Sequence, residues 1–280
     1  PGTEDKGADL CGLPVGELTQ SRNRLVQNTV AMGAVSFLMS IDFSVLEESL
    51  TLRFQRRGQE MVDENVKVAK AGYDYAVEHF RAFDQVPPDG GKPLAVWSGN
   101  EALAMGGAAA GVKFYAAYPM SPATGVLHWM ANNARNLGIM VRQVEDEIGV
   151  ANMVVGAAQA GTRSMCATSG GGFALMTEAI GAASIMEIPC VMVNVMRAGP
   201  STGVPTKTEQ GDLWQCLGAS QGDFERIIVA PTDCLDAFNL MAEVFNLADK
   251  YQCPAIVISD LYISEGRYSV DPDKINMHAQ

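Results

Sequence analysis

Apolar residues recur at intervals of three and four in two stretches of the first eighty residues, and this spacing predicts two helices. The first stretch contains Leu25, Val26, Val30, Ala34, Phe37 and Leu38. The second contains Val62, Val66, Ala69, Tyr73 and Val77. Between them Asp42 precedes the segment 43–50. Because aspartate is a common N-cap, a shorter helix is expected there.

From residue 94 the pattern changes to short, continuous apolar runs that alternate with helical stretches. The runs lie at 94–97, 114–118, 138–141, 163–167, 190–195, 227–229 and 255–258. The helical stretches lie at 100–111, 122–136, 147–160, 171–186 and 232–249. Short runs without polar alternation are typical of strands covered on both faces. The sequence therefore predicts an α/β protein with an open, mostly parallel, doubly wound sheet and helices on both faces.

The helical first part and the α/β part are expected to be separate. About sixty residues of helix bury only a small core, so residues 1–86 are interpreted as the helical tail of another domain, with an arm that packs on a neighbour as the alternative. Residues 87–93, Pro-Pro-Asp-Gly-Gly-Lys-Pro, have the composition of a linker. The α/β domain is expected to span 94–262, and residues 263–280 to begin a linker to a following domain.

Composition and charge narrow the function classes. The chain has 280 residues, 48% of them hydrophobic, which is sufficient for a packed core. Its 32 acidic and 20 basic residues give a formal charge of −12, and without a Lys/Arg cluster this argues against nucleic-acid binding. No apolar run reaches the roughly 18 residues that cross a bilayer, and no charged segment leads into an apolar one with a cleavage site. A cytoplasmic, reducing environment without membrane contact is expected.

The cysteines are spread singly along the chain. They are Cys11, Cys166, Cys190, Cys216, Cys234 and Cys253. Because no C-x-x-C pair occurs, neither a zinc site nor a self-contained iron–sulfur site is predicted, and no metal site is expected on this chain. Each cysteine is interpreted as a small buried hydrophobic residue.

Three consecutive carboxylates, Glu145, Asp146 and Glu147, precede a stretch that is apolar or small on almost every side. Such a stretch predicts a fully buried helix. Helix N-termini favour acids, which accounts for Glu145 and Asp146 as a solvated first turn. Glu147 is expected to point toward the apolar face, where an ionised carboxylate is costly unless paired or neutralised. Glu147 is therefore a candidate functional acid, and an ordinary capping acid is the alternative.

In such a sheet, ligands bind in the loops at the carboxyl ends of the strands. One of these loops is Tyr-Pro-Met-Ser-Pro-Ala-Thr at 118–124, stiffened by two prolines. Its Ser121 is a candidate hydroxyl donor, and a helix N-cap is the alternative. Another is Thr-Ser-Gly-Gly-Gly at 168–172, whose bare backbone would let a ligand approach a helix N-terminus. It is not the G-x-G-x-x-G pattern.

A third loop begins with Arg197, at the end of the run 190–195, and continues to Asp212 through a segment rich in hydroxyl groups. The planar guanidinium binds a carboxylate through two hydrogen bonds. Arg197 is therefore a candidate carboxylate clamp, and a local salt bridge to an acid such as Glu209 is the alternative.

Three motifs in this order resemble the alpha subunit of the 2-oxoacid:ferredoxin oxidoreductases, and among these the 2-oxoglutarate type. They are Tyr-Pro-Met-Ser-Pro-Ala-Thr at 118–124, Glu-Ile-Gly at 147–149 and Arg-Ala-Gly-Pro-Ser-Thr-Gly-Val-Pro-Thr-Lys-Thr-Glu-Gln at 197–210. The resemblance covers residues from about 100 to 260, and residues 1–86 resemble the end of the gamma domain in fused alpha subunits. The family's usual Tyr-Pro-Ile-Thr-Pro is Tyr-Pro-Met-Ser-Pro here, so Ser121 keeps the hydroxyl but loses the methyl that restricts its rotamer.

This resemblance implies a pyrimidine-side thiamine diphosphate domain, with the cofactor shared between subunits. Glu147 would share a proton with the aminopyrimidine ring nitrogen. Residues of the first two loops would contribute to the cofactor site. They are Tyr118, Pro119, Ser169 and Gly170.

The same resemblance implies a site for a 2-oxoacid substrate. Arg197 would bind its carboxylate, and Ser121 would hydrogen-bond near its keto and carboxylate oxygens. Thr206 would line the pocket for the distal end of the substrate. Lys207 would add charge for a second carboxylate, which would favour 2-oxoglutarate over pyruvate.

The implied reaction is the CoA-dependent oxidative decarboxylation of 2-oxoglutarate to succinyl-CoA with reduction of ferredoxin. Mg²⁺ and an iron–sulfur cluster are expected on a partner beta subunit, so that the chain is active only with it, and alpha–beta pairs are expected to dimerise. Pyruvate or a branched-chain 2-oxoacid is the alternative substrate, and a non-catalytic assembly subunit is the alternative function. A nucleotide-binding Rossmann protein is disfavoured because Ser-Gly-Asn-Glu at 98–101 lacks the glycine fingerprint.

Overall fold

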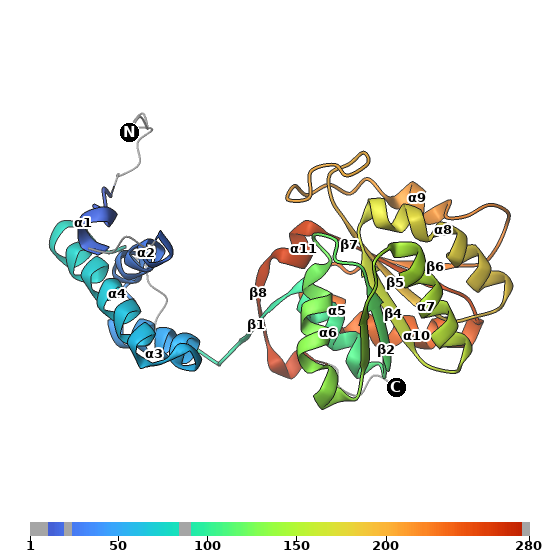
Figure 1. Cartoon of the computed structure of the whole chain (residues 1–280), viewed down its shortest axis with the longest axis horizontal. Coiled ribbons are helices and arrows are strands. Elements are labelled where there is room, and N and C mark those ends of the chain that lie inside the picture. The colour runs from blue at the N-terminus through green and yellow to red at the C-terminus, as the bar shows by residue number, and fades with distance from the viewer. Residues whose placement is uncertain (1–10, 20–23, 84–90, 276–280) are drawn as a thin grey trace. The chain divides into compact units, whose positions relative to one another are not determined.

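The computed structural model describes residues 11–19, 24–83 and 91–275. The chain divides into two compact units, residues 1–91 and 92–280, and each is described by itself (Figure 1). The first unit is helical and the second is built on a parallel sheet.

The helical unit contains the expected helices. They are α1 (Val15–Thr19), α2 (Arg24–Leu38), α3 (Phe43–Phe54) and α4 (Gln59–His79), with a 3₁₀ turn, η1, at Gln55–Arg57. Helix α3 begins after Asp42 as predicted, and the Asp42 side chain accepts a hydrogen bond of 2.8 Å from the Ser44 backbone N–H. Helices α2 and α4 cross in close backbone contact, because a Cβ at Gly33 would overlap the carbonyl of Ala69.

The second unit confirms the predicted α/β fold. Its sheet consists of β2 (Phe114–Ala117), β3 (Met140–Gln143), β4 (Ser164–Thr168), β5 (Val191–Met196), β6 (Ile227–Val229) and β7 (Ala255–Asp260). The strand order is β3-β2-β4-β5-β7-β6, and every neighbouring pair is parallel. The helices are α5 (Gly99–Ala109), α6 (Thr124–Leu137), α7 (Glu147–Gln159), α8 (Gly170–Ile185), α9 (Leu213–Leu217), α10 (Cys234–Tyr251) and α11 (Leu261–Glu265).

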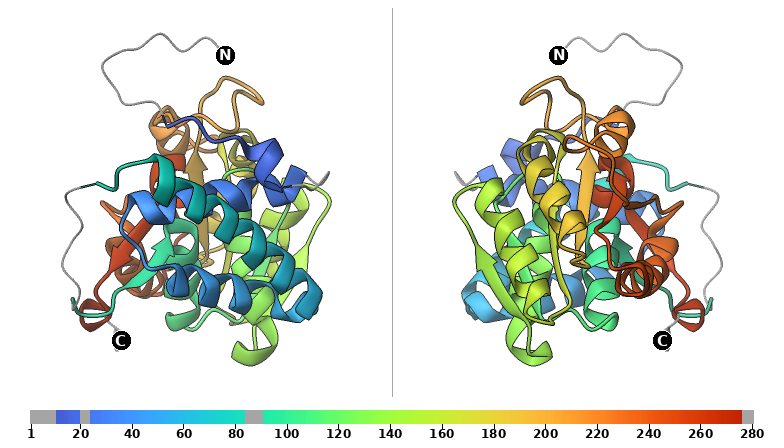
Figure 2. Two further views of the ribbon diagram at one scale, coloured as in Figure 1. Left: turned by 90° about the vertical axis from the view of Figure 1, so that its left-hand side faces the viewer. Right: turned by 90° about the vertical axis from the view of Figure 1, so that its right-hand side faces the viewer.

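Helices cover both faces of this sheet, and successive strand residues point to opposite sides. Met165 and Val193 belong to the core under α5, α6 and α10, whereas Cys166 and Met192 belong to the core under α7 and α8. The yellow-green to yellow helices α7 and α8 and the orange-red helix α10 can be followed in the right-hand view of Figure 2. The continuous apolar runs are explained by this burial on both faces.

The first apolar run differs from the prediction. It forms β1 (Ala95–Ser98), which does not join the parallel sheet but pairs antiparallel with β8 (Arg267–Val270). Val96 is exposed, so the strand is not covered on both faces. Residues 263–275, expected to lie in a linker, therefore include a strand that pairs within the second unit, followed by a 3₁₀ turn, η2, at Pro272–Lys274.

Helix α7 also differs from the prediction that it is fully buried. Val150 and Val154 pack in the core, but Ile148 is 53% and Met153 is 39% exposed. The helix is apolar around most of its circumference, yet the described residues cover only one side of it. The free side carries the apolar Ile148 and Met153 together with the polar Asn152 and Gln159.

The cysteines agree with the prediction in all but one case. Five are buried free thiols, and Cys11 is exposed. Burial, with a contribution from the Cys253 thiol, raises the pKa of Cys190 to about 12, and burial raises the pKa of Cys216 to about 11. These thiols are protonated at neutral pH and act as small apolar side chains. Among the described residues, no helix combines the length and apolar character needed to span a bilayer.

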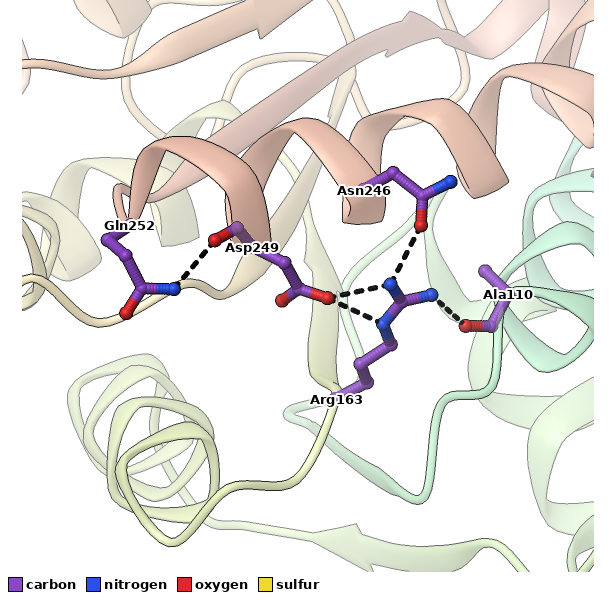
Figure 3. Close-up of polar contacts among 5 residues, drawn as sticks. All are labelled: Ala110, Arg163, Asn246, Asp249 and Gln252. Atoms are coloured by element: carbon purple, nitrogen blue, oxygen red, sulfur yellow. Dashed lines mark hydrogen bonds and ion pairs between the residues drawn. The ribbon is translucent and has the colours of Figure 1, made fainter. Parts of the chain in front are cut away.

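Arg163, the residue before β4, ties the sheet to two helices (Figure 3). Its Nε and Nη2 donate to Oδ2 of Asp249 at 2.9 and 2.6 Å, and Nη2 also donates to Oδ1 of Asn246 at 2.8 Å. Both acceptors belong to α10. Its Nη1 donates to the carbonyl of Ala110, just after α5, at 2.6 Å. One guanidinium thus joins α5, α10 and the beginning of β4.

Arg163→Met is expected to lower the free energy of unfolding by about 1–3 kcal/mol, because it leaves three partly buried acceptors without their donor. Urea unfolding followed by circular dichroism measures this loss. Lys113→Met is the matched control, since the exposed Lys113 ammonium donates only one long bond of 3.4 Å, to the Leu137 carbonyl. It should change the value by less than about 0.5 kcal/mol. Equal losses in the two variants would contradict the role of Arg163.

Candidate active site

The loops predicted to form the site leave the sheet at one edge, the one formed by the carboxyl ends of its parallel strands. Strands β2, β4 and β5 are adjacent and parallel, so the loops that follow them begin side by side. In Figure 1 the gold loop after β5 extends beyond this edge of the sheet. The topology therefore explains how residues far apart in sequence reach one region.

Glu147 is the first residue of α7 and is only 4% exposed. The cap of this helix is Asp146, whose Oδ1 accepts from the Gly149 backbone N–H at 2.7 Å. Glu145 and Asp146 are exposed. The interpretation as a capping acid thus applies to Asp146, whereas the Glu147 side chain turns inward.

The carboxyl group of Glu147 lies against the start of α8. A Cβ built on Gly172 would stand 2.7 Å from Glu147 Oε1 and would overlap the hydroxyl of Thr168. Oε1 is buried and has no hydrogen-bond partner among the described residues. An unpaired buried carboxyl oxygen is costly. Glu147 is therefore available to a group that this chain does not supply.

A second buried oxygen without a partner among the described residues lies just before α8. Ser169 Oγ is buried and has no partner in the described structure, and Ser169 precedes α8 without capping it through its side chain. The neighbouring Thr168 hydroxyl reaches Met120 Sδ at 4.0 Å, so the loop after β2 contacts the loop after β4. Tyr118 is half-buried and Pro119 is exposed.

Arg197 connects the loop after β5 to the loop after β2. It is 8% exposed, and its Nη1 donates to the Ser121 carbonyl while Nη2 donates to the Thr202 carbonyl at 2.8 Å. In the part of the chain that the structure describes, it forms no ion pair. Glu209 Oε2 instead accepts from the Gly199 backbone N–H at 3.1 Å. The alternative of an Arg197–Glu209 salt bridge is therefore wrong.

The Ser121 side chain is not a helix cap. Helix α6 begins at Thr124, its N-cap is Ala123, and no side chain caps it. Ser121 is exposed, and its backbone carbonyl rather than its hydroxyl contacts Arg197. The hydroxyl is thus free of the capping role that was the alternative.

A cleft of about 440 Å³ lies beside Arg197, between the start of α8 and the loop after β5. Its lining includes Gly170, Arg197, Glu209, Asp212 and Gln215. Thr206 and Lys207 are exposed and do not line this cleft, and neither do Glu147 and Ser121. The structure thus brings Arg197 to Gly170 and to the Ser121 backbone, and Glu147 to Gly172. It does not place Thr206 or Lys207 in this cleft.

Asn194 and Asp212 were not identified as candidate site residues from the sequence. Asp212 ends the loop that carries Arg197 and lines the cleft, and it accepts a hydrogen bond from Asn194 of β5. The signal was an asparagine inside an otherwise apolar strand, which needs a polar partner when buried.

Among the described residues, no group of three or more His, Cys, Asp or Glu side chains is arranged to hold a metal.

Comparison with known proteins identifies the family. The model described as "Pyruvate flavodoxin/ferredoxin oxidoreductase, thiamine diP-bdg" matches residues 105–279, more than half of the chain. The chain belongs to this family. A second oxidoreductase model, "Pyruvate ferredoxin/flavodoxin oxidoreductase", matches residues 1–75.

Curated oxidoreductase relatives are about twice as long as this chain. The "2-oxoacid:ferredoxin oxidoreductase 2, subunit alpha" of Aeropyrum pernix is 31% identical over 97% of this chain and 47% of its own length. The "2-oxoglutarate synthase subunit KorA" of Methanocaldococcus jannaschii is 43% identical over 61% of this chain and 47% of its own length. The chain spans about half the length of these relatives.

A solved structure of an oxidoreductase has the same fold. It is the "2-oxoglutarate:ferredoxin oxidoreductase from Magnetococcus marinus with 2-oxoglutarate, coenzyme A and succinyl-CoA bound". The TM-score is 0.83 at 36% identity, over 94% of this chain and 47% of that chain. The resemblance inferred from the three motifs is thereby confirmed at the level of the family.

The residues at this edge fit the cofactor in the family's description. Thiamine diphosphate carries an aminopyrimidine ring with hydrogen-bonding nitrogens, and such a group needs polar partners when it is buried. Glu147 Oε1 and Ser169 Oγ are buried oxygens without partners among the described residues. Both lie next to the glycines that begin α8.

Gly172→Ala is expected to displace the Glu147 carboxyl and to lower the free energy of unfolding by about 1–3 kcal/mol, because the new methyl overlaps Thr168 and crowds Oε1. Gly171→Ala is the matched control in the same turn, since the nearest atom to its Cβ is 3.7 Å away. Thermal and urea unfolding of both variants measure the difference. Two variants of equal stability would contradict the packing of Glu147 on α8.

Proposed function

We propose that this chain forms part of the alpha subunit of a thiamine diphosphate-dependent 2-oxoacid:ferredoxin oxidoreductase. It would provide the pyrimidine side of the cofactor site and the clamp for the substrate carboxylate. The reaction is the CoA-dependent oxidative decarboxylation of a 2-oxoacid, with ferredoxin as the electron acceptor. The observation that carries the proposal is the buried carboxyl of Glu147, whose Oε1 has no partner among the described residues.

In this proposal Glu147 holds and moves a proton at Oε1. Thiamine diphosphate, when bound, supplies the carbon nucleophile and the electron sink for decarboxylation. Glu147 is buried away from water, so its proton would be exchanged with the bound ring and not with solvent. Ser169 and Gly170 would complete the cofactor site at the start of α8, and Tyr118 and Pro119 would approach from the loop after β2.

Arg197 would bind the substrate carboxylate. Two of its N–H groups hold the carbonyls of Ser121 and Thr202, which fixes the plane of the guanidinium. The remaining N–H groups are available for a carboxylate in the cleft. The Ser121 hydroxyl would reach the keto oxygen, and Thr206 would line the pocket for the distal end of the substrate.

The proposed substrate is 2-oxoglutarate, which would give succinyl-CoA. Relatives named 2-oxoglutarate synthase and a solved 2-oxoglutarate oxidoreductase support this choice. Lys207 lies outside the cleft beside Arg197 in the isolated chain. It would need to turn inward to meet the second carboxylate, so pyruvate or a branched-chain 2-oxoacid stays the alternative.

A beta subunit is the proposed partner, and it would carry Mg²⁺ and the iron–sulfur cluster. The exposed side of α7, which carries Ile148 and Met153, is a suitable surface for such a partner, because it begins beside Glu147. Ferredoxin would accept the electrons, and alpha–beta pairs would dimerise in the cytoplasm. Residues 1–86 would be the C-terminal part of a gamma domain, joined by a linker at 87–93 to a cofactor domain that extends past residue 262 and includes β8.

Glu147→Gln is expected to lower oxoacid-dependent turnover at least about a hundredfold in the chain purified with its beta subunit, because proton transfer at Oε1 is lost. Viologen reduction in the presence of CoA measures turnover, with 2-oxoglutarate and pyruvate compared at equal concentration. Glu145→Gln, which alters an exposed acid two residues earlier, is the control and should keep wild-type rates. Turnover of Glu147→Gln within threefold of wild type would rule out the assigned role.

A further inference from the structure

Asn194 is a polar residue inside the central strand β5, where its neighbours Val193 and Val195 belong to the core. It is fully buried. Its Nδ2 donates to Oδ2 of Asp212 at 3.0 Å and to Cys216 Sγ at 3.6 Å. A buried amide in an apolar strand destabilises the fold unless it is paired. The Asn194 amide gains such a partner in Asp212, which lies in the loop after β5.

Asp212 lies at the far end of the loop that carries Arg197. It lines the same cleft as Arg197, and a Cβ on Gly170 would stand 2.7 Å from Asp212 Oδ2. The carboxylate therefore packs against the first residue of α8. Two glycines at the start of α8, Gly170 and Gly172, each make room for a carboxyl group, that of Asp212 and that of Glu147.

The loop between Arg197 and Asp212 is folded onto itself. The Ala198 backbone N–H donates to the Lys207 carbonyl at 2.9 Å, and the Val204 N–H donates to the Ala198 carbonyl at 2.8 Å. The near end of the loop leaves β5 directly. The far end is tied back to β5 by the bond from Asn194 to Asp212, and the neighbouring Gln210 donates from Nε2 to Asp260 Oδ2 at the end of β7 at 2.6 Å.

We propose that Asn194 and Asp212 are positioning residues that close the Arg197 loop against the start of α8. Neither residue needs to touch the substrate. Their bond fixes the loop, and the loop holds the guanidinium in the cleft. As far as it concerns substrate binding, this inference rests on the proposed function, because Arg197 is there the carboxylate clamp. Loss of the bond should therefore weaken the binding of the 2-oxoacid more than it slows the chemical step.

The closure of the loop is tested by hydrogen–deuterium exchange on the full chain, which does not depend on activity. Asp212→Ala removes the acceptor, and peptides within 198–211 are expected to exchange at least tenfold faster. Asp212→Asn keeps a carbonyl oxygen that accepts the same bond, and it should exchange like wild type. Asp223→Ala, which alters an exposed acid in another loop, is the control. Unchanged exchange of 198–211 in Asp212→Ala would overturn the proposal.

The effect on binding is tested in the chain purified with its beta subunit. Asp212→Ala is expected to raise the KM for 2-oxoglutarate at least tenfold with kcat within about threefold of wild type, and Asp212→Asn should restore the KM. Faster exchange throughout the chain, with kcat and KM both altered, would reduce Asp212 to a stability residue and overturn the proposal. If the wild-type pair shows no oxoacid-dependent activity, the proposed function fails, while the exchange experiment still decides whether Asp212 closes the loop.

Discussion

The candidate site depends on one contact, the packing of the Glu147 carboxyl against the glycine turn that begins α8. Any side chain at Gly172 would occupy the space of Glu147 Oε1 and of the Thr168 hydroxyl. The turn therefore admits the carboxyl group while leaving Oε1 without a partner in the described structure. Burial of this kind makes the acid available to a bound group and unavailable to water.

The parallel sheet supplies the rest of the arrangement. Because β2, β4 and β5 are neighbours, their loops start together, and Arg197 links two of them through backbone carbonyls. Asn194 and Asp212 then tie the end of the third loop to the strand from which it leaves. The loop after β5 is thus tied at its far end to the strand and is joined to the loop after β2 by Arg197.

Most of the fold could be predicted from the sequence, because the apolar runs and helical stretches have distinct periods. The strand at 95–98 was assigned to the wrong sheet, since a run of four residues does not reveal which strand it pairs with. The burial of Glu147 followed from its place on an apolar helix. The partners of Arg197 and Asn194 did not, because hydrogen bonds to backbone carbonyls and to distant loops leave no periodic pattern in the sequence.

The most direct test of the account is the affinity for thiamine diphosphate of the chain assembled with its beta subunit, measured by isothermal titration with Glu147→Ala and Glu145→Ala. If the unpaired oxygen of Glu147 serves the cofactor, Glu147→Ala should bind it at least about tenfold more weakly, whereas Glu145→Ala should bind it within twofold of wild type. Wild-type affinity in Glu147→Ala would contradict the central claim.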